Sequence, residues 1–133
     1  MEWKVERINR PEDIFKDINK KMPQPVGIVL FGTDHYLKMD ICREFLRTIE
    51  NLQAVNCSPN LKWPVAKSAI IEGMNILIAL SNDQSETPSI YHKIATELNN
   101  LGVKTIIGVY VASGKMKLRN PPTAANFNYL ITI

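Results

Sequence analysis

An unbroken apolar run at residues 76–80 constrains the fold more than any other feature of the sequence. Five apolar residues from Ile76 to Leu80 follow one another, and a polar cluster at 81–86 comes directly after them. A strand with one face in water alternates apolar and polar residues, whereas a strand buried on both faces shows a continuous apolar run. The run therefore predicts a central strand of a parallel sheet that helices cover on both sides.

Length and composition fit a single domain over residues 1–133. Hydrophobic residues make up 45% of the chain and charged residues 22%, and a chain of 133 residues can bury a real core. No segment approaches the roughly 18 apolar residues that a membrane helix needs. The charged N-terminus is not followed by an apolar stretch, so it does not resemble a signal peptide. We therefore expect a cytoplasmic protein that does not contact a membrane.

The charged, cysteine and histidine residues argue against three classes of function. The net charge of +3 is small and spread along the chain, which disfavours a dedicated nucleic-acid binder. Cys42 and Cys57 form no CxxC motif, so a thioredoxin-type redox centre is excluded. Together with His35 and His92 they have no zinc-ligand spacing. We expect no metal site, and no disulfide in a reducing compartment.

Strands and helices are predicted to alternate along the whole chain. Alternation of strands and helices predicts an α/β fold with a parallel sheet. One region allows two interpretations, because 69–71 could form a strand paired with 75–80 instead of ending a helix. The predicted strands are 3–8, 26–31, 53–57, 75–80, 104–111 and 129–133, and the predicted helices are about 10–22, 36–51, 63–72 and 88–101, with a helical turn at 123–127.

The helix predicted at 36–51 has one apolar face. Leucine, isoleucine and phenylalanine residues recur every four positions, which is the spacing of a buried stripe. The charged residues of the same segment are assigned to the opposite, solvent-facing side. The apolar stripe comprises Leu37, Ile41, Phe45 and Ile49, and the solvent-facing set comprises Lys38, Asp40, Arg43, Glu44 and Arg47.

The predicted topology is a three-layer, flavodoxin-like or Rossmann-like domain with a mostly parallel sheet. Counting from 26–31 as the first strand, the expected order is 2-1-3-4-5, with the N-terminal strand added at one edge. A thioredoxin-like sheet, in which Pro64 would be the cis-proline, is the alternative fold.

Ligands of open α/β sheets bind beyond the carboxyl ends of the strands, where the winding changes direction. Here that point is predicted between 26–31 and 75–80, and three loops leave the same edge of the sheet. Their hydroxyl, amide, carboxylate, imidazole and ammonium groups, together with helix N-termini, suit an anionic small molecule such as a nucleotide. The expected binding residues are Gly32, Thr33, Asp34, His35, Ser81, Asn82, Asp83, Ser113, Gly114 and Lys115.

The candidate catalytic residues are His35 and Asp34, because an imidazole and a carboxylate can both transfer protons. A plain helix cap is the other interpretation of Thr33 and Asp34. Cobalamin-binding modules share the predicted winding and carry Asp-x-His-x-x-Gly after their first strand. Asp34 and His35 lack both the spacer and the glycine, so no function is carried over from that family.

Two functions follow as hypotheses. The first is a domain that binds a nucleotide-like or other phosphorylated small molecule at the carboxyl-end crevice, as a sensor or as an enzyme. The alternative is a non-catalytic adaptor or subunit that presents a surface to a protein partner or to another copy of the chain. Neither the ligand's identity nor any cofactor follows from the residues.

Overall fold

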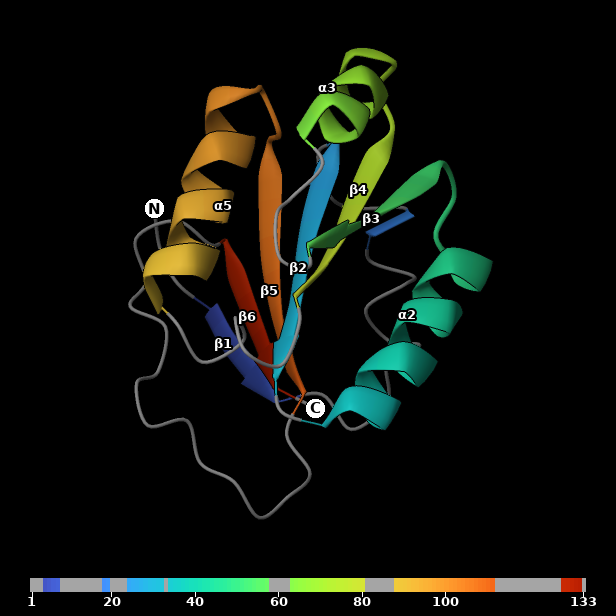
Figure 1. Ribbon diagram of the computed structural model, residues 1–133, viewed down its shortest axis with the longest axis vertical. Coiled ribbons are helices and arrows are strands. Elements are labelled where there is room, and N and C mark those ends of the chain that lie inside the picture. The colour runs from blue at the N-terminus through green and yellow to red at the C-terminus, as the bar shows by residue number, and fades with distance from the viewer. Residues whose placement is uncertain are drawn as a thin grey trace.

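Parallel strands form the centre of the protein. A computed structural model describes residues 4–7, 18–19, 24–32, 34–57, 63–80, 88–111 and 128–132. Among these residues the strands form one sheet in the order β1-β6-β5-β2-β4-β3, and every pairing in it is parallel (Figure 1). The strands are β1 (Lys4–Arg7), β2 (Val26–Gly32), β3 (Leu52–Cys57), β4 (Asn75–Leu80), β5 (Thr105–Val111) and β6 (Tyr129–Thr132), and the helices are α2 (His35–Thr48), α3 (Trp63–Ile71) and α5 (Pro88–Asn100).

Helices cover both faces of the sheet at its central strands, β5, β2 and β4, as the unbroken apolar run predicts. Alternate residues of a strand point to opposite faces, and β2 divides accordingly. Val29 and Phe31 join the core cluster beneath α3 and α5, whereas Ile28 and Leu30 join the cluster beneath α2. Figure 1 shows α5 and α2 on opposite sides of the sheet. The α/β class with a parallel sheet is therefore confirmed.

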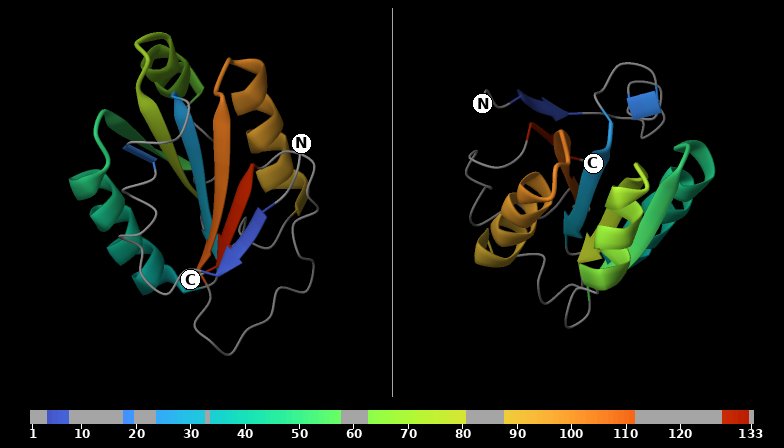
Figure 2. Two further views of the ribbon diagram at one scale, coloured as in Figure 1. Left: turned by 180° about the vertical axis from the view of Figure 1, so that it is seen from behind. Right: turned by 90° about the horizontal axis from the view of Figure 1, so that it is seen from above.

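Two strands extend the centre on one side. β6 pairs with β5, and β1 pairs with β6 at the edge, so the first and last strands of the chain lie side by side (Figure 2). Residues 18–19 are helical and lie near the end of α2, where Asn19 Nδ2 donates to Thr48 O over 2.9 Å. The rest of the helix predicted at 10–22, and the turn predicted at 123–127, lie outside the described residues.

The predicted strand order 2-1-3-4-5 is wrong, because the two strands at its centre, 26–31 and 75–80, are exchanged. β4, not β2, is the neighbour of β3, and β4 in turn pairs with β2 through Gly27–Ile76 to Leu30–Ala79. Both strands are buried on both faces, so their composition does not indicate which one lies next to β3. The 14 residues of α2 span about 21 Å, which is enough to return the chain from the carboxyl edge to the amino edge of the sheet.

The structure decides two alternatives, the strand or helix at 69–71 and the thioredoxin-like fold. Helix α3 continues through Ile71, so 69–71 is not a strand. Pro64 lies inside α3, and the cis peptide bond within the described residues precedes Pro25, so the thioredoxin-like alternative is wrong. Helix α2 ends at Thr48, three residues before its predicted end, and Asn51 has a positive φ of 51°.

Side-chain hydrogen bonds close the amino edge of the sheet. Asn75 is fully buried at the start of β4, where its Oδ1 accepts from Val26 N over 2.9 Å. Its Nδ2 donates to Glu50 O over 3.0 Å, which joins the turn after α2 to the starts of β2 and β4. Buried polar groups satisfied in this way hold the backbone in place. No helix among the described residues is long and apolar enough to cross a membrane.

Candidate functional site

The winding changes direction between β2 and β4, which are neighbours in the sheet. From β2 the chain enters α2 on one face and returns at β3, beyond β4. From β4 it enters α5 on the other face and returns at β5, beyond β2. The two connections thus leave the carboxyl ends of these neighbouring strands on opposite faces, and it is at the carboxyl ends that open α/β sheets bind their ligands. The change of direction is where the sequence predicts it, although the strand order is not.

Gly32 ends β2 in a conformation that only glycine adopts readily. Its φ is +137°, and a Cβ atom placed on it would lie 2.0 Å from the carbonyl oxygen of Val111. Gly32 is the register partner of Val111 at the end of β5. A positive φ and a close backbone approach are both costly for a residue with a side chain. We therefore assign Gly32 a role in bringing β2 and β5 together at this edge.

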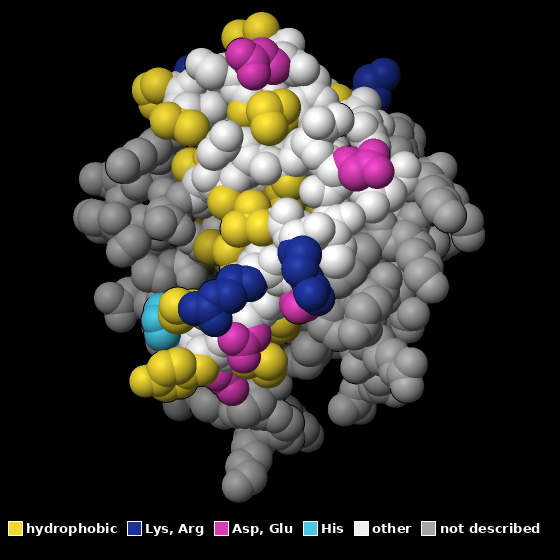
Figure 3. Space-filling view, turned by 90° about the vertical axis from the view of Figure 1, so that its right-hand side faces the viewer, with side chains coloured by type: hydrophobic (Ala, Val, Ile, Leu, Met, Phe, Trp, Pro, Cys, Tyr) yellow, Lys and Arg dark blue, Asp and Glu magenta, His cyan; other side chains and the backbone are white. Residues whose placement is uncertain are grey.

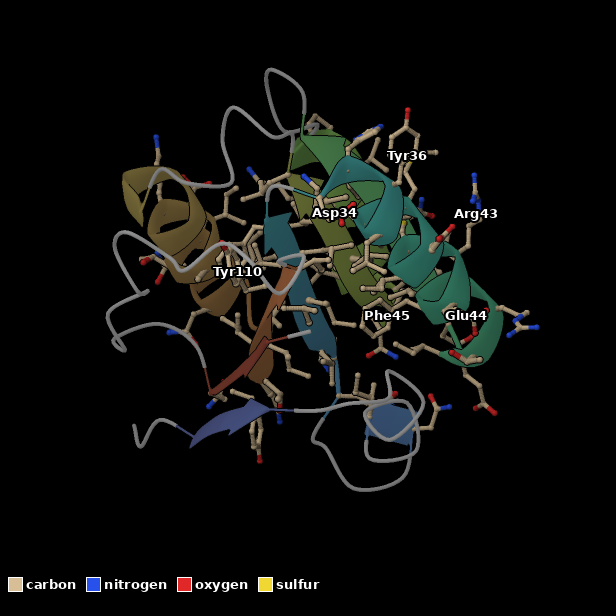
Figure 4. The ribbon with its side chains drawn as sticks, turned by 90° about the horizontal axis from the view of Figure 1, so that it is seen from below. Asp34, Tyr36, Arg43, Glu44, Phe45 and Tyr110 are labelled. Carbon is tan, nitrogen blue, oxygen red and sulfur yellow. The ribbon has the colours of Figure 1, made fainter. Side chains whose placement is uncertain are left out.

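Asp34 starts helix α2 as its N-cap. Its backbone is extended, its Oδ1 accepts from Leu37 N over 3.0 Å, and its carbonyl oxygen accepts from Lys38 N over 3.0 Å. Figure 4 shows Asp34 at the start of α2, close to the end of β2. A capping carboxylate satisfies one of the free N–H groups of the first turn. The helix-cap interpretation of Asp34 is confirmed.

His35 is the first residue of α2 and is exposed. Its ring meets that of Tyr36 edge-on, with 5.9 Å between the ring centroids and 66° between the ring planes. Tyr36 is itself 82% exposed. The imidazole therefore sits at the outer rim of the edge, where it is open to solvent.

Lys38 is the residue that sequence reasoning misses. The charge pattern predicts it on the solvent side of its helix, and this is wrong, because Lys38 is only 4% exposed. Its Nζ donates to the carbonyl oxygen of Leu80, the last residue of β4, over 3.0 Å. Burial lowers the pKa of the Lys38 ammonium, and the nearby Asp34 carboxylate partly opposes that shift. Lys38 thus brings an amine to the carboxyl end of β4, next to β2.

A signal for the burial of Lys38 is present in the spacing of the helix. Lys38 precedes the buried Ile41 by three positions and the buried Phe45 by seven, so all three lie along one side of α2. A search for buried residues at intervals of four positions alone does not include Lys38. A lysine in line with two core residues at i+3 and i+7 is the pattern to look for.

The remaining predicted binding residues lie outside the described part of the chain. They are Thr33, Ser81, Asn82, Asp83, Ser113, Gly114 and Lys115. The structure places the strand ends that precede two of these loops, at Leu80 and Val111. The site that can be described therefore consists of Gly32, Asp34, His35 and Lys38.

Of the two cysteine side chains, the structure describes that of Cys42. Cys42 is a half-buried free thiol whose pKa is raised by burial, an effect that the charge of Arg43 partly opposes. It packs against the core cluster beneath α2, as expected for a core residue. The side chain of Cys57 lies outside the described residues. Within the described ranges, no three His, Cys, Asp or Glu side chains are grouped as metal ligands would be.

The described side chains offer a buried cation, a capping carboxylate and the amino end of a 14-residue helix at one edge of the sheet. An amino end carries partial positive charge, and the ammonium adds to it. Groups of this kind can hold an anion and can move a proton at its edge. No protein-family model, curated protein or solved structure gives a significant match to this chain.

Proposed function

We propose that this protein binds a phosphorylated, nucleotide-like small molecule at the carboxyl ends of β2 and β4, as a sensor or as an enzyme acting on that molecule. The anionic group would meet the Lys38 ammonium and the first turn of α2. The winding in two directions from neighbouring strands, which flavodoxin-like and Rossmann-like sheets share, supports this location.

The observation that carries the proposal is the burial of Lys38. Lysine is among the residues least often fully buried, because removing an ammonium from water costs free energy that a neutral side chain does not. Here Lys38 is only 4% exposed, and its ammonium donates to the end of a central strand. Ionisable groups with a shifted pKa in such positions are concentrated at functional sites. An anion bound at this edge would stabilise the charged form of Lys38.

The other residues of the edge have separate roles in this proposal. Asp34 holds the first turn of α2 in place through its bond to Leu37 N. His35 lies exposed at the rim, where it can reach a bound molecule from the solvent side. If the protein is an enzyme, these two side chains are the candidates for proton transfer. Ser81, Asn82, Asp83 and Lys115 remain candidates for contacts to the ligand.

A panel of ligands tests the proposal through thermal stability. Nucleotides and sugar phosphates should raise the melting temperature, whereas the corresponding neutral nucleosides and sugars should not. A ligand at 100 times its dissociation constant adds about 2.7 kcal/mol to the unfolding free energy. For a domain of this size that corresponds to a shift of several degrees, which differential scanning fluorimetry resolves.

Two matched variants assign the effect to the proposed edge. Lys38→Met should reduce the affinity roughly 10- to 100-fold, the loss of one charge-assisted hydrogen bond. Lys104→Met is the control, because Lys104 is exposed at the amino edge of the sheet, directly before β5. If no anionic compound shifts the melting temperature and a pull-down recovers one stoichiometric protein partner, the adaptor function replaces this proposal.

A further inference from the structure

The outward face of α2 carries large side chains in a single row. Tyr36, Met39 and Leu46 are 82%, 40% and 45% exposed, and the side chain of Arg43 is 68% exposed. Their spacing of i, i+3, i+7 and i+10 places them along one side of the helix, over about 15 Å. We call these four residues the α2 row. Figure 4 shows Tyr36 and Arg43 pointing away from the sheet.

The composition of the α2 row is that of a protein interface. Tyrosine, methionine and arginine are enriched where proteins meet, and leucine adds apolar area. Arg43 of the row forms an ion pair with Asp40 at 3.1 Å, and a second pair, Arg47 with Glu44 at 2.6 Å, lies beside the row. Figure 3 shows this side of the molecule, where basic and acidic side chains lie next to hydrophobic ones.

We propose that the α2 row binds the same row of a second copy of this chain, with the two helices antiparallel. The charges of the helix argue for this partner. Two acids, Asp40 and Glu44, alternate with two bases, Arg43 and Arg47, so the face has no net charge. A partner of one charge sign would meet a like charge at every second contact, whereas an inverted copy can bring Asp40 opposite Arg43.

The spacing of the residues allows this pairing to be reciprocal, as a two-fold axis requires. With the axis between residues 41 and 42, Asp40 lies opposite Arg43 of the second copy, and Tyr36 lies opposite its Arg47. Met39 and the Leu46 of the other copy then lie about 3 Å apart along the helix direction, within reach of each other. Each contact occurs twice. The pairing thus joins two opposite charges, a cation over a tyrosine ring and an apolar pair.

The proposed dimer is weak, because one helix per copy gives an interface at the small end of the range for specific complexes. It does not depend on ligand binding, since Lys38 lies on the opposite side of α2 from the row. Sedimentation of the wild-type chain over a concentration series should therefore show a monomer–dimer equilibrium.

Charge reversal identifies the interface. In Asp40→Arg alone, two arginines face one another at each contact, and in Arg43→Asp alone two aspartates do. Each variant should dimerise roughly tenfold more weakly than wild type or worse. An equimolar mixture of the two variants restores both opposite-charge contacts, so it should form a heterodimer with close to wild-type affinity.

The controls separate this interface from other causes. Lys93→Glu reverses an exposed charge on α5 and should leave the dimer unchanged. Circular dichroism should show both α2 variants folded, because each loses only an exposed pair within one helix. A wild-type chain that stays monomeric up to about 1 mM overturns the proposal. A dimer that both single reversals leave intact also overturns it, because the contact then lies elsewhere.

Discussion

Gly32→Ala is expected to lose about 3 kcal/mol or more of unfolding free energy. The new Cβ would lie 2.0 Å from the carbonyl oxygen of Val111, and its backbone would keep a φ of +137°. Backbone on both sides of the contact belongs to central strands, so neither side can move without breaking the pairing of β2 with β5. Urea unfolding followed by circular dichroism measures the loss.

Gly102→Ala is the matched control for this prediction. Gly102 also has a positive φ, +95°, but a Cβ added there meets no atom within 4 Å. The variant should lose only the cost of the left-handed conformation, about 1–2 kcal/mol. Equal losses at the two positions would mean that the approach of Gly32 to Val111 is not a constraint on the edge of the sheet.

Lys38→Met is expected to separate stability from binding. Methionine keeps most of the apolar stem and removes the ammonium whose burial costs free energy, so the variant should be at least as stable as wild type at pH 7. The same change should weaken binding of the anionic ligand roughly 10- to 100-fold. Stability gained together with function lost is typical of residues kept for a site. A loss of about 2 kcal/mol or more would instead make Lys38 a structural tie between α2 and β4.

The difference in unfolding free energy between Lys38→Met and wild type should depend on pH, because the pKa of Lys38 is lowered. Between that pKa and the usual 10.5, the unfolded chain holds a proton on Lys38 that the folded chain lacks, so stability rises with pH. Below the folded-state pKa the cost of the buried charge is present in full. The stability advantage of Lys38→Met should therefore be greatest near neutral pH and shrink as the pH rises toward 10.5. An advantage that grows with pH would contradict the assignment.

The elements that the sequence predicts well are those in which local signals agree. Helix α5 begins at Pro88, buries Ile94 and Leu98 on one face, and is followed by Gly102 with a positive φ. Proline at a helix start, a stripe at helical spacing and glycine after the end all indicate the same boundaries. The apolar run in β4 likewise predicts burial on both faces, which the structure shows.

The strand order could not be predicted from the sequence, because it depends on contacts between distant segments. β2 and β4 are alike in composition, and either could lie beside β3. The change of winding between β2 and β4 could be predicted, because these two strands are neighbours both in the predicted order and in the structure. The buried cation of the site was missed because a charged residue in a helix is normally assigned to solvent.

One measurement tests the central claim most directly. Carbon-13 NMR of protein labelled at the lysine ε-carbons follows each lysine separately, and the Lys38 signal is assigned by its disappearance in Lys38→Met. Titration with the strongest anionic binder of the ligand panel should shift the Lys38 signal and leave that of Lys104 in place. Binding that leaves the Lys38 signal unmoved would contradict the claim that this edge of the sheet holds the anion.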